Sequence, residues 1–406
     1  MSTSTVTRRP DDGGQGKEQR DGSALGFWAG VGAVFQLESR QRMRSRGWYV
    51  MLAVWFAVTA LVAGLAAWTA GSEEGFGQVM FELVIGFVLF FGLLVAPALS
   101  ANTITGDRAG GTLAILQNTL LTPGQILCGK WLAAWISSLA FLLVSVPMII
   151  WAMTYGDVYL PAVPVLVALT AVELGVACAI GVGISARSAR PLFAIVASYL
   201  VVALLGLGTL IIYGLSFQLV KESAMASEQI WPDDPWEEVR YNEKDEAVDA
   251  QGDVIEDQEA YFAEIEKKSA AVFDEQNFSC GKALFPVNVY HTERNTWLLA
   301  ANPFVVVADA APVRPRNAAA DDYVGEGPME AVSTMVRQAQ RGTAATDPCL
   351  DGVKQPVVDE YDLTGTTPLW PLGLGVQVVL AAGLLESGRR RLRTPVKKLT
   401  RGTRLA

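Results

Sequence analysis

Long uninterrupted runs of apolar residues dominate the hydrophobic pattern of this chain. Six runs each reach about 18 to 25 residues, the length that a helix needs to cross the hydrocarbon core of a bilayer. They cover residues 48–70, 79–100, 131–154, 160–185, 191–217 and 367–385. Only a helix satisfies all its backbone polar groups within one segment of a bilayer. The pattern therefore predicts an all-α integral membrane protein with six transmembrane helices.

Basic residues gather immediately before the first run and after the last. The first group is Arg40, Arg42, Arg44 and Arg46, and the second is Arg389, Arg390, Arg391, Arg393, Lys397, Lys398, Arg401 and Arg404. Positive charge favours the cytoplasmic side of a membrane, so both termini are predicted to be cytoplasmic. An even number of spans is then required, and six satisfies it. We expect a multi-pass protein of the cell (plasma) membrane.

The two termini differ in composition from the spans. Residues 1–24 are polar and Gly-rich, which predicts a disordered cytoplasmic tail, and residues 386–406 form a basic cytoplasmic tail. In residues 25–47, apolar positions recur at helical spacing before a charged stretch. This segment either lies on the inner membrane surface as an amphipathic interfacial (elbow) helix or extends the first span into the cytoplasm.

Residues 218–366 leave the membrane for a length typical of a domain. They hold 29 Asp and Glu against 12 Lys and Arg, although the whole chain has a net charge of only −9. We expect a large, acidic, mainly helical extracytoplasmic domain, with helices near 254–273 and 329–339 and a buried or re-entrant segment at 297–311. Because Cys280 and Cys349 both fall in this oxidising compartment, one disulfide is favoured over free thiols.

Residues 48–217 contain the first five spans, and the polar loop at 101–130 divides them. Within it, residues 111–121 can form a helix with one apolar face. Gly124 to Lys130 matches the spacing of a phosphate-binding loop, but Trp131 stands where Ser or Thr should bind magnesium, which argues against ATP binding. The single histidine cannot build a metal cluster. We therefore expect no catalytic residues, no metal site and no enzyme activity in this chain.

Glu173 is the one acid near the middle of a predicted span. A carboxyl group in hydrocarbon is costly, so it should face other helices or a wet cavity. It either lines a transport pathway or makes a structural hydrogen bond between helices. Glu82 lies near the outer end of the second span, where snorkelling to water favours a structural role.

The loop also resembles a known family. The stretch from Gly106, Asp107 and Arg108 to Leu113, then Leu120 to Pro123 and Ile126 to Lys130, looks like the cytoplasmic signature of ABC-2-type permeases. The charged segment before the first span, the six-span layout and Asn302-Pro303-Phe304 add to the resemblance. Ala109, Ala114 and the Gly124-Gln125 pair depart from it where the family usually carries charge.

The resemblance implies a permease subunit of an ATP-driven exporter that provides the translocation pathway. Its partners would be a separate ABC ATP-binding subunit, which binds the ATP and Mg, a second permease in a homo- or heterodimer, and membrane lipids, but no nucleic acid. Contact with the ATPase would fall on a cytoplasmic coupling helix in the 101–130 loop. The matching positions are Asp107, Arg108, Gly111, Thr112, Leu113, Thr122, Pro123, Gly129 and Lys130.

Two other functions compete with this one. A membrane-anchored receptor or cell-envelope interaction protein would act through the acidic domain. An ion-coupled transporter would use Glu173, but it predicts more intramembrane charge or internal repeats than the sequence contains.

Overall fold

The structure is a computed structural model. It describes residues 26–70, 76–113, 121–242, 244, 246–249, 251–272, 277–314, 327–342, 348–355 and 365–393. The predicted tail at 1–24, most of the predicted coupling helix (114–120) and the basic tail beyond 393 lie outside these residues. Within the described part, six helices are long and apolar enough to cross a membrane, as predicted.

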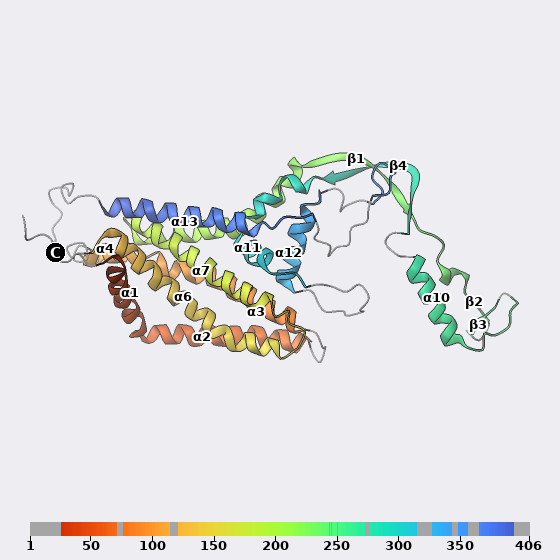
Figure 1. Cartoon of the computed structure of the whole chain (residues 1–406), viewed down its shortest axis with the longest axis horizontal. Coiled ribbons are helices and arrows are strands. Elements are labelled where there is room, and N and C mark those ends of the chain that lie inside the picture. Colours follow the sequence, from red (N-terminus) through yellow and green to blue (C-terminus); the bar gives the residue numbers. More distant parts are fainter. Residues whose placement is uncertain are drawn as a thin grey trace, which may run out of the picture.

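These helices run side by side in one elongated bundle (Figure 1). The bundle contains α1 (Phe27–Met43), α2 (Arg46–Ala70), α3 (Gly77–Ser100), α4 (Thr103–Ala109), α6 (Pro123–Met153), α7 (Ala162–Arg187), α8 (Pro191–Ala203), the π-helical turn η1 (Leu204–Gly208), α9 (Thr209–Ser216), the turn η2 (Phe217–Leu219) and α13 (Trp370–Leu392). The candidate spans are Arg46–Thr69, Gly77–Ala109, Pro123–Met153, Ala162–Arg187, Pro191–Leu219 and Trp370–Leu392.

Helix α7 forms the centre of the bundle, whereas the span Pro191–Leu219 lies at its edge. Within their most apolar windows, 67% of the α7 span is buried but only 11% of Pro191–Leu219. Small residues let neighbours approach α7 closely: a Cβ on Gly183 would lie 2.8 Å from the backbone of Leu384 in α13. The indole of Trp135 on α6 donates to the carbonyl of Ala171, 2.8 Å away. The central position of α7 therefore depends on both glycine packing and side-chain hydrogen bonds.

Helix α6 begins earlier than the sequence analysis placed the third span. It starts at Pro123 rather than at Trp131, so the segment that imitates a phosphate-binding loop is helical. Thr122 and Gln125 form a capping box: each side chain binds the backbone of the other residue. Pro123 fits the first turn because its missing N–H would have no helical partner there. Hydropathy alone missed this start because the first two turns are only partly apolar.

Helix α1 is separate from α2 and turns sharply away from its axis (Figure 1). The two helices meet at Arg44 and Ser45, and α1 packs against α6 instead of continuing the first span. Of the two alternatives for this segment, the structure therefore contradicts a continuous extension of the first span. We call this end of the bundle, where α1 and α4 lie, the α1 end.

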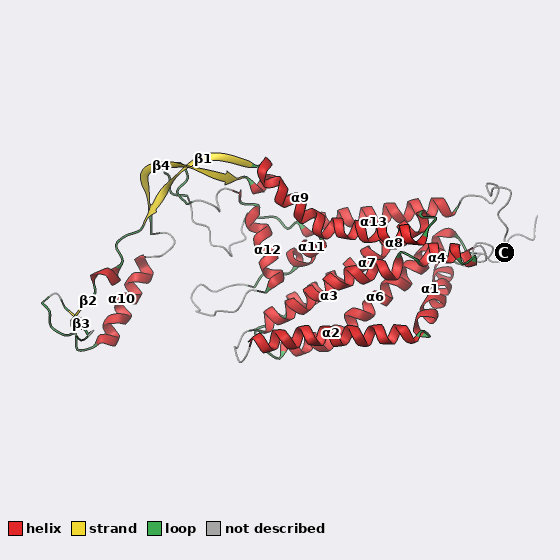
Figure 2. Cartoon of the chain, turned by 180° about the vertical axis from the view of Figure 1, so that it is seen from behind, coloured by secondary structure: helices red, strands yellow, loops and turns green. Residues whose placement is uncertain are grey.

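The opposite end carries the segment between α9 and α13, and we call it the hairpin end. Its elements are β1 (Lys221–Ile230), η3 (Pro235–Glu238), β2 (Arg240–Tyr241), β3 (Ala247–Val248), α10 (Gln258–Val272), β4 (Ser279–Tyr290), η4 (Thr292–Arg294), η5 (Thr296–Leu299), α11 (Pro303–Ala310) and α12 (Pro328–Ala339). Strands β1 and β4 pair antiparallel, with Lys221 opposite Tyr290, and they project from the bundle with α10 beyond them (Figure 2).

The sequence analysis did not predict this hairpin within the segment that it expected to be mainly helical. Helices α10 and α12 lie near the two predicted positions, but long strands connect α10 to the bundle. The sequence did not predict this strand because β1 is rich in residues of low β propensity such as Ala, Glu and Lys. Its partner strand lies about 60 residues away in the sequence.

A disulfide joins Cys280 on β4 to Cys349, with 5.5 Å between the two Cα atoms. This is the pairing that the sequence favours. The residues around Cys349 also run along β1: Ser227 donates its N–H to the Cys349 carbonyl over 3.1 Å. The bridge thus fastens a third segment to the end of the β1–β4 pairing that lies farthest from the bundle.

Helix α11 is buried between the bundle and α12, in the part of the chain predicted as a buried or re-entrant segment. Asp309 is the key polar residue here. One of its carboxylate oxygens pairs with Arg337 of α12, and the other accepts the N–H groups of Leu369 and Trp370 at 2.6 and 3.0 Å. Asp309 therefore caps the N-terminus of α13 and holds α11, α12 and α13 together.

Candidate functional site

A buried lysine connects three helices at the α1 end. Lys130 of α6 is 1% exposed, yet its ammonium group pairs with Glu38 of α1 and lies 2.6 Å from a carboxylate oxygen of Asp107 in α4. Two carboxylates around one ammonium group compensate its loss of water. We call Glu38, Asp107 and Lys130 the charge triad.

Close backbone packing brings α1 and α6 together beside the charge triad. A Cβ on Gly129 would lie 2.6 Å from the Cβ of Val34 and 2.9 Å from the carbonyl of Val31. A Cβ on Gly30 would likewise meet the side chain of Gln125 at 2.6 Å. Glycine is therefore required at this crossing, and the crossing places Lys130 next to Glu38.

Helix α4 is fixed to α7 by hydrogen bonds. The hydroxyl oxygen of Ser185 on α7 accepts the N–H groups of Ile104 and Thr105, both at 3.1 Å, and so caps the first turn of α4. The guanidinium of Arg108 donates to the carbonyls of Ser188 and Ala186 at the end of α7. Any displacement of α4 is therefore passed both to α6, through Asp107, and to α7.

Arg42 adds a link between α1 and α3. Its guanidinium donates to the carbonyl of Leu99 over 2.8 Å. Burial lowers the pKa of Arg42, and Glu38, one turn earlier on α1, acts in the opposite direction. The two side chains therefore bind different neighbours from the same face of α1.

Beyond α4 the chain turns to the surface. Ala109, Gly110, Gly111 and Thr112 are exposed, and Gly111 has φ +76°, a conformation that favours glycine. Leu113 then returns to the interior, where it packs with Ile104, Leu127 and Leu392. Residues 109–112 therefore form an exposed turn on an anchored helix.

Most of the residues predicted to contact an ATPase thus point inward. Asp107, Arg108, Leu113, Gly129 and Lys130 make contacts within the bundle. Thr122 and Pro123 form the N-terminus of α6, and Thr122 is exposed. Gly111, Thr112 and Thr122 are the fully exposed members of this set, and Asp107, Arg108 and Pro123 are partly exposed.

Sequence reasoning missed Glu38, Gln125 and Ser185, which complete this site. Glu38 did carry a signal, because it is the only acid in α1. Ser185 carried none, since serine is common in membrane helices and only the fold brings it to α4.

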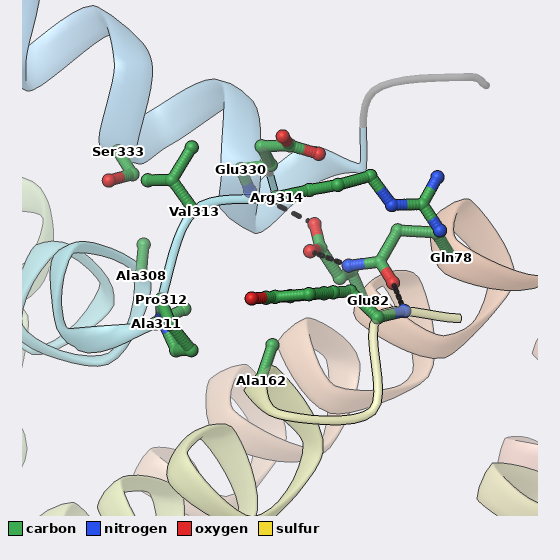
Figure 3. Close-up of a pocket in the computed structure, with 11 residues that line it drawn as sticks. Gln78, Glu82, Ala162, Ala308, Ala311, Pro312, Val313, Arg314, Glu330 and Ser333 are labelled. Carbon is green, nitrogen blue, oxygen red and sulfur yellow. Dashed lines mark hydrogen bonds between the residues drawn. The ribbon is translucent and has the colours of Figure 1, made fainter. Parts of the chain in front are cut away.

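A second polar cluster lies at the hairpin end (Figure 3). Glu82 of α3 is 2% exposed and accepts the N–H groups of Met329 and Glu330 at 2.8 and 3.0 Å, which caps α12. Its other oxygen accepts from Gln78 at 2.5 Å, and Gln78 accepts the N–H of Tyr159. The sequence analysis predicted that Glu82 has a structural role and snorkels to water. The cap on α12 is such a role, but the side chain does not reach water because α12 covers it.

Glu173 lies apart from both clusters, in the middle of α7. It is 1% exposed, and its Oε1 atom has no hydrogen-bond partner among the described residues. The described residues contain no group of three or more His, Cys, Asp and Glu side chains that could hold a metal ion.

Neither a comparison with models of protein families nor one with curated proteins finds a match for this chain.

Proposed function

We propose that this chain is the membrane-spanning permease subunit of an ATP-driven exporter of the ABC-2 type. In this proposal the α1 end faces the cytoplasm, a separate ATP-binding subunit docks on it, and the substrate crosses between this permease and a second one. The arginines in the last turns of α1 and α13 both lie at the α1 end, and they support this orientation because positive charge favours the cytoplasmic side.

The charge triad is the observation that carries the proposal. The exposed turn at 109–112 belongs to a helix bound to α6 through Asp107 and to α7 through Ser185 and Arg108. A force on the turn would therefore reach two membrane helices and, through Glu38, α1 as well. This is the mechanical arrangement that a subunit driven from outside the membrane requires.

The exposed span Pro191–Leu219 supports the expected assembly. Its outward face is apolar, with Leu200, Leu207 and Leu215 at 67%, 62% and 71% exposure. Lipid or a second permease would cover such a face in a membrane.

Co-expression with candidate ABC ATPases of the same organism, followed by co-purification, tests the proposal. Thr112→Arg and Ala109→Arg change the exposed turn and leave the three side chains of the charge triad intact, although Thr112→Arg removes a hydrogen bond from the Thr112 hydroxyl to the backbone carbonyl of Asp107. Both should weaken ATPase association while the chain still inserts and folds. Thr154→Arg is the matched control, since Thr154 is exposed at the hairpin end. Equal association of all three variants with the ATPase would refute docking at this turn.

Side-specific labelling of single cysteines tests the orientation. After Cys128 and Cys178 are replaced, cysteines at the exposed positions Thr112 and Trp236 should react from opposite sides of the membrane. Labelling of both from the same side would refute the six-span arrangement.

A receptor or cell-envelope interaction protein stays the alternative, and the projecting hairpin arm favours it (Figure 2). Deletion of residues 231–278, which lie beyond the β1–β4 pairing, separates the two functions. An exporter should keep its ATPase association after the deletion, whereas a receptor should lose its function.

A further inference from the structure

A small cavity lies beside Glu173, where six elements of the bundle meet. Besides Glu173 of α7, its walls include Leu93 of α3, Val202 of α8, Leu205 of η1, Pro303 of α11 and Gln377 of α13. The cavity has room for a group about the size of one water molecule. Glu173 and Gln377 are the polar residues among its lining residues, and Glu173 is the only titratable one.

One oxygen of the Glu173 carboxyl group is available for a ligand, although the side chain of Gln377 also interacts with this group. Its Oε1 atom is buried and accepts no hydrogen bond from the described residues. An unpaired acceptor at such a position costs free energy that a donor group in the cavity would recover. The Gln377 side chain is 1% exposed and is held in place by a hydrogen bond from its Nε2 to the carbonyl of Ala301, 3.1 Å away.

One wall of the cavity contains an irregular helix. Leu205 belongs to the π-helical turn Leu204–Gly208, and such turns interrupt regular helical hydrogen bonding. The amide of Asn302 donates to the carbonyl of Gly206 at 2.9 Å and to the hydroxyl of Thr209 at 3.0 Å. Asn302 thus stabilises a local helix distortion directly beside the cavity, where a regular helix would be stiffer.

This wall also faces outward. Leu200, Leu204 and Leu207, on the same helical segment as Val202 and Leu205, are 57% to 67% exposed and apolar. The same helical segment therefore borders the cavity with one side and presents an apolar surface with the other.

We propose that this cavity binds the ammonium group of a lipid-soluble amine, with Glu173 as its counter-ion. A carboxylate in an apolar site is stabilised most by a positively charged donor, because the pair removes the cost of two separate buried charges. A primary ammonium group is close to water in size and donates hydrogen bonds, so it suits Oε1 of Glu173. The inference rests on the proposed export function only in naming the substrate class, since binding itself needs no ATPase.

The test uses the purified full-length chain in lipid nanodiscs without any ATPase. The probe is a long-chain primary alkylamine that carries a photoreactive diazirine, and the alcohol of the same length is the neutral comparison. Mass spectrometry then locates the cross-links. We expect the amine to label peptides of α7, α8 and α13 at least tenfold more than the alcohol does.

Glu173→Gln should remove this preference, whereas Glu173→Asp should keep part of it. Thr170→Val is the matched control, because Thr170 is a buried residue of the same helix with an unpaired hydroxyl and does not line the cavity. It should label like the wild type. If Glu173→Gln does not fold, the ratio of amine to alcohol labelling in the wild type still tests whether the cavity prefers an amine.

Equal labelling by amine and alcohol, or unchanged labelling of Glu173→Gln, would overturn the proposal. The result is independent of ATPase co-purification. If the amine labels the site but no ATPase co-purifies with the chain, the site stands and the exporter proposal is refuted. If an ATPase co-purifies but the amine shows no preference over the alcohol, the exporter proposal stands and the site is refuted.

Discussion

Replacement of Lys130 by methionine tests the charge triad most directly. Methionine fills a similar volume but removes the ammonium group, so Glu38 and Asp107 would face each other without a cation. Breaking a buried ion pair by removing one partner costs about 3 to 5 kcal/mol. Because the side chains of Glu38 and Asp107 are 15% and 27% exposed, water can reach both, and we expect a loss near the lower value.

Removal of one carboxylate should cost less. In Glu38→Gln the ammonium group keeps Asp107 as its partner, and we expect a loss of about 1 to 2 kcal/mol. The double variant Glu38→Gln/Lys130→Met no longer places two carboxylates together. It should therefore be less destabilised than the sum of the single variants, with a coupling energy of about 1 to 3 kcal/mol.

Equilibrium unfolding in mixed micelles, followed by tryptophan fluorescence, measures these differences. Lys268→Met is the control, since it makes the same chemical change on exposed α10, where Lys268 pairs with Glu264 one turn away. It should leave the unfolding curve of the bundle unchanged. If Lys130→Met unfolds like Lys268→Met, or if the single losses simply add, the triad does not hold the three helices together.

Three further predictions concern packing and capping. Gly129→Val places a branched side chain where a Cβ alone would lie 2.6 Å from the Cβ of Val34, so the free energy of unfolding should fall by about 1 to 3 kcal/mol. Gly32→Ala is the control, because a Cβ at Gly32 would have nothing within 4 Å. Equal stability of both variants would contradict the close crossing. Glu82→Gln weakens the cap on α12, so the Met329 and Glu330 amides should exchange hydrogen faster by a factor that corresponds to about 1 kcal/mol; unchanged exchange would contradict the cap. Cys280→Ser/Cys349→Ser should lose about 2 to 4 kcal/mol of stability at the far end of the β1–β4 pairing and should speed proteolysis of residues 231–278. Cleavage at the wild-type rate would show that the bridge adds nothing.

The sequence by itself determined the membrane class of the protein and the number of its spanning helices. Bilayer thickness fixes the length of a span and lipid excludes unpaired backbone, so a run such as residues 191–217 admits one structure. The two cysteines of residues 218–366 also suggested their own pairing, because few partners were available. Local chemistry was sufficient for these conclusions.

Only the tertiary structure decided which polar residues act together. The sequence predicted Lys130 as the last residue of a loop, but in the structure it is buried between Glu38, 92 positions earlier, and Asp107. The hairpin likewise depends on pairing between distant strands of low intrinsic β propensity. The acidic character of Glu173 was visible in the sequence, but its cavity forms from six elements that only the folded bundle brings together. Contacts between residues far apart in the chain leave no local pattern in the sequence, and for that physical reason only the tertiary structure shows them.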